Sequence, residues 1–109
     1  MGDKTDLLQG TLDLIVLRLL RGGPANGWDV TQSIQVISKG ALEINYGSVY
    51  PALRRLEAQG FVKAEWGTSD NNRRARFYEL TASGRKQLAA ERDAWERFSA
   101  ALGLILDSR

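Results

Sequence analysis

The sequence predicts a mainly α fold of the α+β class, in which three helices, a β-hairpin and a fourth helix follow one another. Two observations support this prediction. Apolar residues recur at helical spacing in four segments, which short breaks separate. Between the third and fourth segments, two stretches rich in aromatic and β-branched residues flank residues 67–72, which are dense in turn formers and so indicate a hairpin.

The first helix is expected over residues 6–21. Asp6 and Gln9 have the spacing of a capping box, and the glycines and proline of residues 22–24 form a strong stop. Apolar residues cover most of the circumference of this helix. It therefore needs cover on more than one side, either from its own domain or from a second subunit.

The second helix is expected to begin after an Asn26 cap and to end near Gly40. A third helix is expected over residues 47–59, with Pro51 in its first turn, where a missing N–H is tolerated, and Gly60 as its stop. The inward-facing residues are expected to be Ile34, Ile37 and either Trp28 or Val30 in the second helix, and Val49, Leu53 and Leu56 in the third.

Strands are expected over residues 61–66 and 74–80, and Thr81 then caps a final helix over residues 82–106. Five apolar residues of this helix fall at the a and d positions of a heptad. They are Leu88, Trp95, Phe98, Leu102 and Ile105.

This element order is that of a winged helix-turn-helix with an N-terminal helix and an added C-terminal helix. We expect residues 1–80 to form a DNA-binding winged helix-turn-helix domain. Residues 81–109 should form a dimerisation helix that packs on the same core, because a helix of roughly 36 Å is too long for that core to cover alone.

The composition argues against catalysis. The chain has 109 residues, of which 43% are hydrophobic and 26% are charged, as expected for one globular domain. It contains no cysteine and no histidine, which excludes disulfides, zinc fingers, thiol nucleophiles and imidazole bases. No two carboxylates fall together in a pattern that predicts a catalytic cleft. We therefore expect no enzyme activity, no metal and no cofactor.

No segment approaches the roughly 18 uninterrupted apolar residues that a membrane span requires. The most apolar run, residues 14–20, is interrupted by Arg18, and three aspartates precede it. A secretory signal peptide would instead begin with basic residues. We therefore expect a cytoplasmic protein with no membrane partner.

Basic charge is concentrated at the tip of the expected hairpin. The net charge is only +2, and residues 1–46 hold four basic against five acidic residues. Residues 70–76, in contrast, hold three arginines and one acid. Such a local basic tip is typical of a module that contacts phosphate with one surface.

The chain contains three motifs, each of them once: GTLDL at residues 10–14, GSVYPAL at residues 47–53 followed by RLE, and NNRRARFY at residues 71–78 followed by LTASG. Together they resemble the PadR family of bacterial transcriptional regulators, over nearly the whole chain. The single short C-terminal helix is similar to that of the smaller PadR subfamily. Asn26 stands where family members often have histidine, and Val49 where leucine is common.

The resemblance implies a transcriptional regulator that binds double-stranded DNA as a homodimer. It further implies a repressor of a palindromic operator, relieved by a small hydrophobic or aromatic effector. Repression is implied by the resemblance alone, since no residue chemistry distinguishes repressor from activator. The alternative is a winged-helix protein-interaction module without a specific operator.

Two groups of residues are expected to contact DNA. The start of the third helix should enter the major groove, and the hairpin tip should lie along or in the minor groove, where arginine suits the concentrated negative potential. The expected contacts are Ser48, Tyr50 and Arg54 from the helix and Asn72, Arg73 and Arg74 from the hairpin.

Each of these contacts has a structural alternative. The arginines can be solvated residues on an amphipathic face, the Tyr50 ring can be half buried, and the hairpin tip can serve solubility alone. Arg55 is uncertain because Glu57 or the hairpin can occupy it. Arg76 is expected to run along its strand and to bridge to Glu65 across the hairpin.

The final helix carries the expected dimer interface, formed by its five heptad residues, Leu88, Trp95, Phe98, Leu102 and Ile105. In part of the resembling family, an aromatic residue at the position of Trp95 lines a pore at the dimer centre and stacks on flat hydrophobic compounds. Phe98, Leu8 and Leu12 could join it there. The alternative is that Trp95 only packs as an interface anchor.

Overall fold

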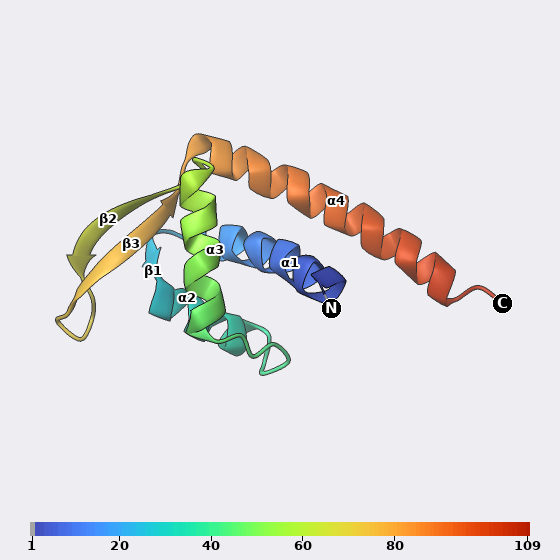
Figure 1. Ribbon diagram of the computed structural model, residues 1–109, viewed down its shortest axis with the longest axis horizontal. Helices are drawn as coiled ribbons and strands as arrows, with labels where there is room; N and C mark the ends of the chain where they lie inside the picture. The colour runs from blue at the N-terminus through green and yellow to red at the C-terminus, as the bar shows by residue number, and fades with distance from the viewer. Residues whose placement is uncertain (1) are drawn as a thin grey trace.

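A computed structural model describes the backbone of residues 2–109 and the side chains of residues 10–109. The elements follow in the order α1 (Gly2–Leu20), β1 (Ala25–Asn26), α2 (Gly27–Ile37), α3 (Tyr46–Ala58), β2 (Val62–Thr68), β3 (Arg74–Leu80) and α4 (Ala82–Leu106), as Figure 1 shows. This confirms the predicted mainly α fold with one hairpin.

Helices α1, α2 and α3, the start of α4 and the base of the hairpin enclose a single core. The helices contribute the predicted apolar faces, and the strands contribute Val62, Tyr78 and Leu80 from the end of the hairpin nearest the helices. Toward its tip the hairpin is exposed and projects away from the core (Figure 1). Its outer half is therefore not held by apolar packing.

Three side-chain caps begin the helices after α1. The side-chain oxygens of Asn26, Asn45 and Thr81 accept the backbone N–H groups of Asp29, Ser48 and Gly84 at 2.8, 3.1 and 3.0 Å. These bonds satisfy donors that the first turn of a helix leaves without intrahelical partners. Gly60, with φ of 80°, follows the end of α3 as predicted.

Several predicted boundaries were wrong. Helix α1 begins at Gly2, four residues before the expected Asp6 cap. Helix α2 ends at Ile37 rather than near Gly40, and Ile37 is 68% exposed rather than facing inward. Val30, and not Trp28, is the buried residue of the first turn of α2.

The third helix also begins earlier than predicted. Because α3 begins at Tyr46, Pro51 lies in its second turn rather than its first. Its exposed position lets the ring sit without a clash against the core, and the missing N–H leaves only one carbonyl near the helix start without its helical partner. The buried face of Val49, Leu53 and Leu56 is as predicted.

The short strand β1 was not predicted. It pairs antiparallel with β3, Ala25 opposite Tyr78 and Asn26 opposite Phe77, so that the sheet order is β1-β3-β2. Strand β3 is therefore the central strand. This pairing joins the start of α2 directly to the hairpin.

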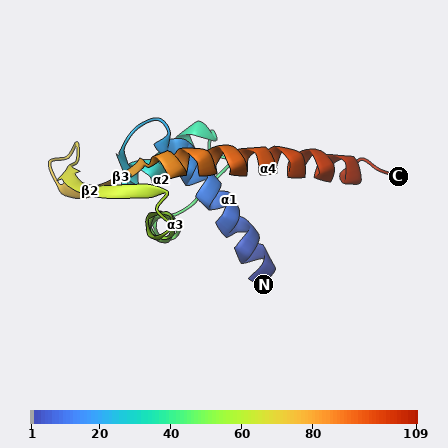
Figure 2. The same ribbon diagram turned by 90° about the horizontal axis from the view of Figure 1, so that it is seen from above.

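Helix α4 runs from the hairpin back past α1 and then beyond every other element, which Figures 1 and 2 both show. The molecule is consequently elongated, with extents of 57 × 29 × 26 Å. Leu88, near the start of α4, is buried in the core at 4% exposure. In the part of the chain that the structure describes, no helix is long and apolar enough to cross a membrane.

Candidate nucleic-acid interface

A groove of about 770 Å³ lies between the start of α2, the outer side of α3 and the hairpin. Its lining combines basic and aromatic side chains from all three elements. The residues of that kind include Trp28, Tyr50, Arg54, Trp66, Arg73 and Arg74. Guanidinium groups and hydrogen-bonding aromatic side chains on one concave face suit a polyanion.

The α3 side of the groove is organised around Tyr50. The Tyr50 ring lies 6.0 Å from the ring of Tyr46, centroid to centroid, and its hydroxyl accepts a hydrogen bond from Arg54 Nη1 at 3.0 Å. This hydrogen bond, followed by the Coulombic effect of the same tyrosine, raises the pKa of Arg54. Tyr50 is 36% exposed, and it lines the groove together with the Arg54 side chain that donates to it.

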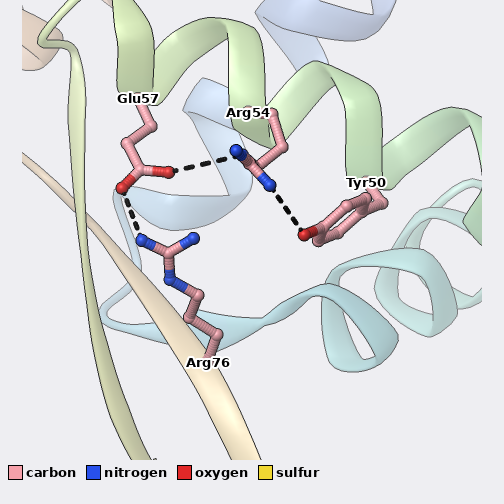
Figure 3. Close-up of polar contacts among 4 residues, drawn as sticks. All are labelled: Tyr50, Arg54, Glu57 and Arg76. Atoms are coloured by element: carbon pink, nitrogen blue, oxygen red, sulfur yellow. Dashed lines mark hydrogen bonds and ion pairs between the residues drawn. The ribbon is translucent and has the colours of Figure 1, made fainter.

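Glu57 lies at the centre of a second set of contacts, drawn in Figure 3. Its Oε2 accepts a hydrogen bond from Arg76 Nη2 of β3 at 2.8 Å, and its Oε1 is 3.8 Å from Arg54 Nε. The expected bridge between Arg76 and Glu65 was wrong, because the strand register places Glu65 opposite Phe77. Arg76 therefore joins the hairpin to α3 rather than one strand to the other.

Arg55 is not held by Glu57 or by the hairpin. Its Nη2 donates to Asp13 Oδ1 of α1 at 2.7 Å, on the side of α3 that faces α1. The two arginines in succession on α3 thus have different partners. Arg54 borders the groove, and Arg55 ties α3 to α1.

The hairpin tip is closed by Ser69. The Ser69 N–H donates to the carbonyl of Arg73 at 2.8 Å, and the Asn72 N–H donates to the carbonyl of Ser69 at 2.9 Å. Asn72 has φ of 62°, a left-handed conformation that asparagine tolerates better than most residues. Asn72 thus shapes the turn that presents the Arg73 side chain, in agreement with the turn predicted over residues 67–72; the sequence reasoning did not specify its left-handed conformation.

Trp66 is a residue of this surface that the sequence reasoning also missed. Its ring is 61% exposed, and the guanidinium carbon of Arg74 lies 4.7 Å from the ring centroid. The signal in the sequence was a tryptophan at the end of the expected strand 61–66, directly before the turn formers of residues 67–72. That position predicts an exposed ring beside the basic tip.

The structure brings together Tyr50, Arg54, Arg73 and Arg74 around the groove. Ser48 and Asn72 are exposed but lie outside its lining. Among residues 10–109, no group of three or more histidine, cysteine, aspartate or glutamate side chains is placed to hold a metal ion.

The residues expected at a dimer centre lie elsewhere, on α4. The rings of Trp95 and Phe98 are exposed and lie 5.9 Å apart, and Leu102 and Ile105 are exposed further along the same helix. Leu12 and Leu88 are instead part of the chain's own core, which leaves little of either for a partner or a ligand to contact. The side chain of Leu8 lies outside the described residues.

Comparisons with known proteins identify the family and the fold. The model of the transcriptional regulator PadR-like family matches residues 16–90. A transcriptional regulator of Mycobacterium tuberculosis is 35% identical over 65 residues, which are 60% of each chain.

Two solved structures cover nearly the whole fold. A transcriptional regulator from Clostridium thermocellum has a TM-score of 0.80 at 26% identity, over 90% of this chain and 92% of the other. A PadR family transcriptional regulator from Eggerthella lenta has a TM-score of 0.79 at 28% identity, over 99% and 92%.

Proposed function

The chain belongs to the PadR-like family of transcriptional regulators, and on that basis we propose that it is a dimeric repressor that binds a palindromic operator. As a member of this family it is a regulator and not an enzyme. The observation that carries the proposal is the groove in which side chains from the start of α3 and from the hairpin tip face one another.

The two sides of the groove have different tasks in this proposal. The start of α3 enters the major groove, where Ser48, Tyr50 and Arg54 contact base edges and phosphates. The hairpin tip follows the backbone into the minor groove, where Asn72, Arg73 and Arg74 supply affinity with less choice of sequence. Residues 1–80 act as the DNA-binding domain.

The exposed stripe of α4 supports the dimer. Trp95, Phe98, Leu102 and Ile105 are apolar and exposed, and their heptad spacing places them on one side of a helix that extends beyond the rest of the chain (Figure 2). In the proposed dimer, residues 81–109 form the dimerisation helix, and contact with a second copy removes this apolar surface from water. Two α3 helices about 34 Å apart would then read the two halves of a palindrome.

The effector proposal rests on the ring pair of Trp95 and Phe98. A flat hydrophobic or aromatic compound that stacks between these rings and those of the partner would favour one dimer geometry over another, and so lower operator affinity. Fluorescence titration with flat aromatic compounds tests this proposal. Because Trp28 and Trp66 are also exposed, a Trp95→Phe control is needed to assign the signal. A signal that persists in that variant would contradict binding at Trp95.

Selection of bound duplexes from random DNA tests the operator proposal. We expect a palindromic motif to be enriched, and its gel shift to weaken steeply with salt. An Arg54→Ala variant should lose preference at one base position of each half-site, whereas a Lys63→Ala variant, altered on the hairpin outside the groove, should keep it. If no motif is enriched, the protein-interaction alternative replaces the repressor.

A further inference from the structure

The proposed DNA contacts come from two elements whose relative position must be fixed. The start of α3 and the hairpin tip lie on opposite sides of the groove. The core holds the base of the hairpin through Val62, Tyr78 and Leu80, but the outer positions of β2 are mostly exposed. Apolar packing and the pairing with β1 thus hold the base of the hairpin, and a further contact is needed to hold its outer half at a fixed angle from α3.

One contact is placed to do this. Among residues 10–109, the Arg76–Glu57 pair is the ion pair that joins α3 to the hairpin. Arg76 lies two residues from the buried Tyr78 and two residues from Arg74, so the pair fastens the hairpin midway between its base and its tip. The Arg76 guanidinium also lies over the Tyr78 ring, 5.8 Å from its centroid.

The geometry of this pair is better than that of a typical surface ion pair. The side chains of Arg76 and Glu57 are only 31% and 28% exposed, and the 2.8 Å distance is that of a charge-assisted hydrogen bond. Glu57 and Arg54, in contrast, are 3.8 Å apart, and Arg54 is 56% exposed. The bond to Arg76 is therefore the one that Glu57 holds firmly, and Arg54 can leave Glu57 for DNA at little cost.

A carboxylate at this place is unexpected on electrostatic grounds alone. Glu57 borders a surface proposed to receive phosphate, and a negative charge there repels the backbone of DNA. Simple electrostatics thus predicts that removal of this charge strengthens binding to every DNA sequence. A positioning role predicts a different result, because correct placement of the hairpin matters most for the operator.

We infer that Glu57 is a positioning residue, whose carboxylate holds Arg76 and so fixes the hairpin at the angle from α3 that the operator requires. The inference rests on the proposed DNA-binding function. It concerns discrimination between operator and other DNA rather than affinity in general. Glu57 Oε1 also lies 3.8 Å from Arg54 Nε, and Arg54 Nη1 donates to Tyr50, as Figure 3 shows, so the same carboxylate also lies beside the α3 side of the groove.

Two variants that change the net charge in opposite directions test this inference. Glu57→Gln removes a negative charge and Arg76→Gln removes a positive one, and both remove the same ion pair. For a random duplex, the first should bind more tightly and the second more weakly. In both variants, the ratio of operator affinity to random-duplex affinity should fall by roughly fivefold to tenfold. The double variant should show the same fall as each single one, since the pair can be lost only once.

Asp13→Asn is the matched control. It also removes the carboxylate partner of an α3 arginine, Arg55, at a similar distance of 2.7 Å, but on the side of α3 that faces α1. Its affinity ratio should stay at the wild-type value. If Glu57→Gln raises operator and random affinity in equal proportion, the carboxylate acts only as a local charge and the inference is overturned.

A measurement without DNA separates this inference from the proposed function. Amide hydrogen exchange at residues 69–73 of the free protein should be faster in both variants than in wild type and in Asp13→Asn. If the wild type shows no preference for any operator while this exchange difference is present, the proposed function fails and the positioning contact stands. Unchanged exchange at these residues in both variants would refute the contact itself, and circular dichroism confirms that each variant is folded.

Discussion

The indole ring of Trp66 and the guanidinium of Arg74 stack on one another, with 4.7 Å between the guanidinium carbon and the ring centroid. The register explains why they meet. Trp66 lies opposite Arg76 and Thr68 lies opposite Arg74, so the two residues are diagonal neighbours on one face of the hairpin. A stacked guanidinium keeps its N–H groups free at its edge to donate to phosphate.

The first prediction concerns this stack. Trp66→Leu should weaken operator binding by about twofold to fivefold, because an exposed cation–π contact contributes roughly 0.5–1 kcal/mol to the placement of Arg74. Trp28→Leu is the control, since Trp28 lines the same groove and has no stacked arginine in the described part of the chain. Isothermal titration with the selected operator measures both. An equal loss in the two variants would indicate general contact with the groove rather than placement of Arg74.

The second prediction concerns the charge of the hairpin tip. Replacing Arg73 and Arg74 by alanine together should weaken binding to all sequences and reduce the slope of log affinity against log salt by about one to two. The measurement is a salt titration on operator and random duplexes. Arg97→Ala, on an exposed arginine of α4 paired with Asp93, should leave the slope unchanged. A tip variant with a wild-type slope would show that the hairpin does not reach phosphate.

The third prediction concerns the exposed stripe of α4. Phe98→Glu should give a monomer at micromolar concentration, because it places a charge in the centre of the proposed interface. Operator affinity should then fall to that of a single half-site. Leu104→Glu makes the same change one position off the stripe and should remain dimeric. Sedimentation velocity distinguishes the two, and a wild-type protein that is itself monomeric would contradict the proposed interface.

The fourth prediction concerns Glu91, which lies on α4 near Asp13 of α1. Burial, with a smaller effect of the Asp13 carboxylate, raises the pKa of Glu91, although the hydrogen bond from Gln87 opposes it. A pKa that is higher in the folded than in the unfolded state means that the contribution of Glu91 is favourable below its unfolded pKa. That contribution is lost as pH rises through the folded pKa. At neutral pH the ionised side chain therefore lowers the stability.

Glu91→Gln should accordingly raise the melting temperature at pH 7 and leave it unchanged at pH 3. The expected gain is small, about a few tenths of a kcal/mol, because the group is partly screened by water. Thermal unfolding at the two pH values measures it. Glu96→Gln, on an exposed residue of the same helix, should show no such difference. A gain of equal size at both pH values would point to helix propensity instead.

The fifth prediction contrasts two glycines of α4. A Cβ on Gly84 would lie 1.9 Å from the carbonyl oxygen of Phe61, because the first turn of α4 packs directly on the chain that follows α3. Gly84→Ala should therefore destabilise the fold by about 1–3 kcal/mol or more. Gly103→Ala should instead stabilise it by about 1 kcal/mol, since nothing lies within 4 Å of the added carbon. Urea unfolding of both variants checks the contrast, and similar effects in the two would refute the close approach.

The elements that could be predicted from the sequence are those with local signals. Helix α4 has the predicted bounds because Thr81 caps it and its apolar stripe continues to Ile105. Strand β1 carried no such signal, since two residues are too few to show a period. Its pairing depends on the position of β3, more than fifty residues later in the chain.

The candidate site was predicted less fully for the same reason. Arg54 and Arg73 were placed correctly beside one groove, because element order and charge suffice for that. The partner of Arg76 depends instead on how the hairpin packs against α3. This packing cannot be predicted from the spacing of residues along the chain. The heptad pattern of α4 likewise predicts an apolar stripe but not what covers each residue of it. Leu88 and Trp95 share one stripe, but the first is buried in the chain's own core and the second is exposed.

The placement of Leu88 anchors α4 in the core near one end, and most of the helix extends beyond this anchor. About 27 Å of helix extends from this buried anchor to Leu106, at 1.5 Å per residue. Each degree of rotation about the anchor therefore moves the far end of α4 by about half an ångström. A rotation of several degrees at Leu88 would thus displace the far end of the helix by several ångströms.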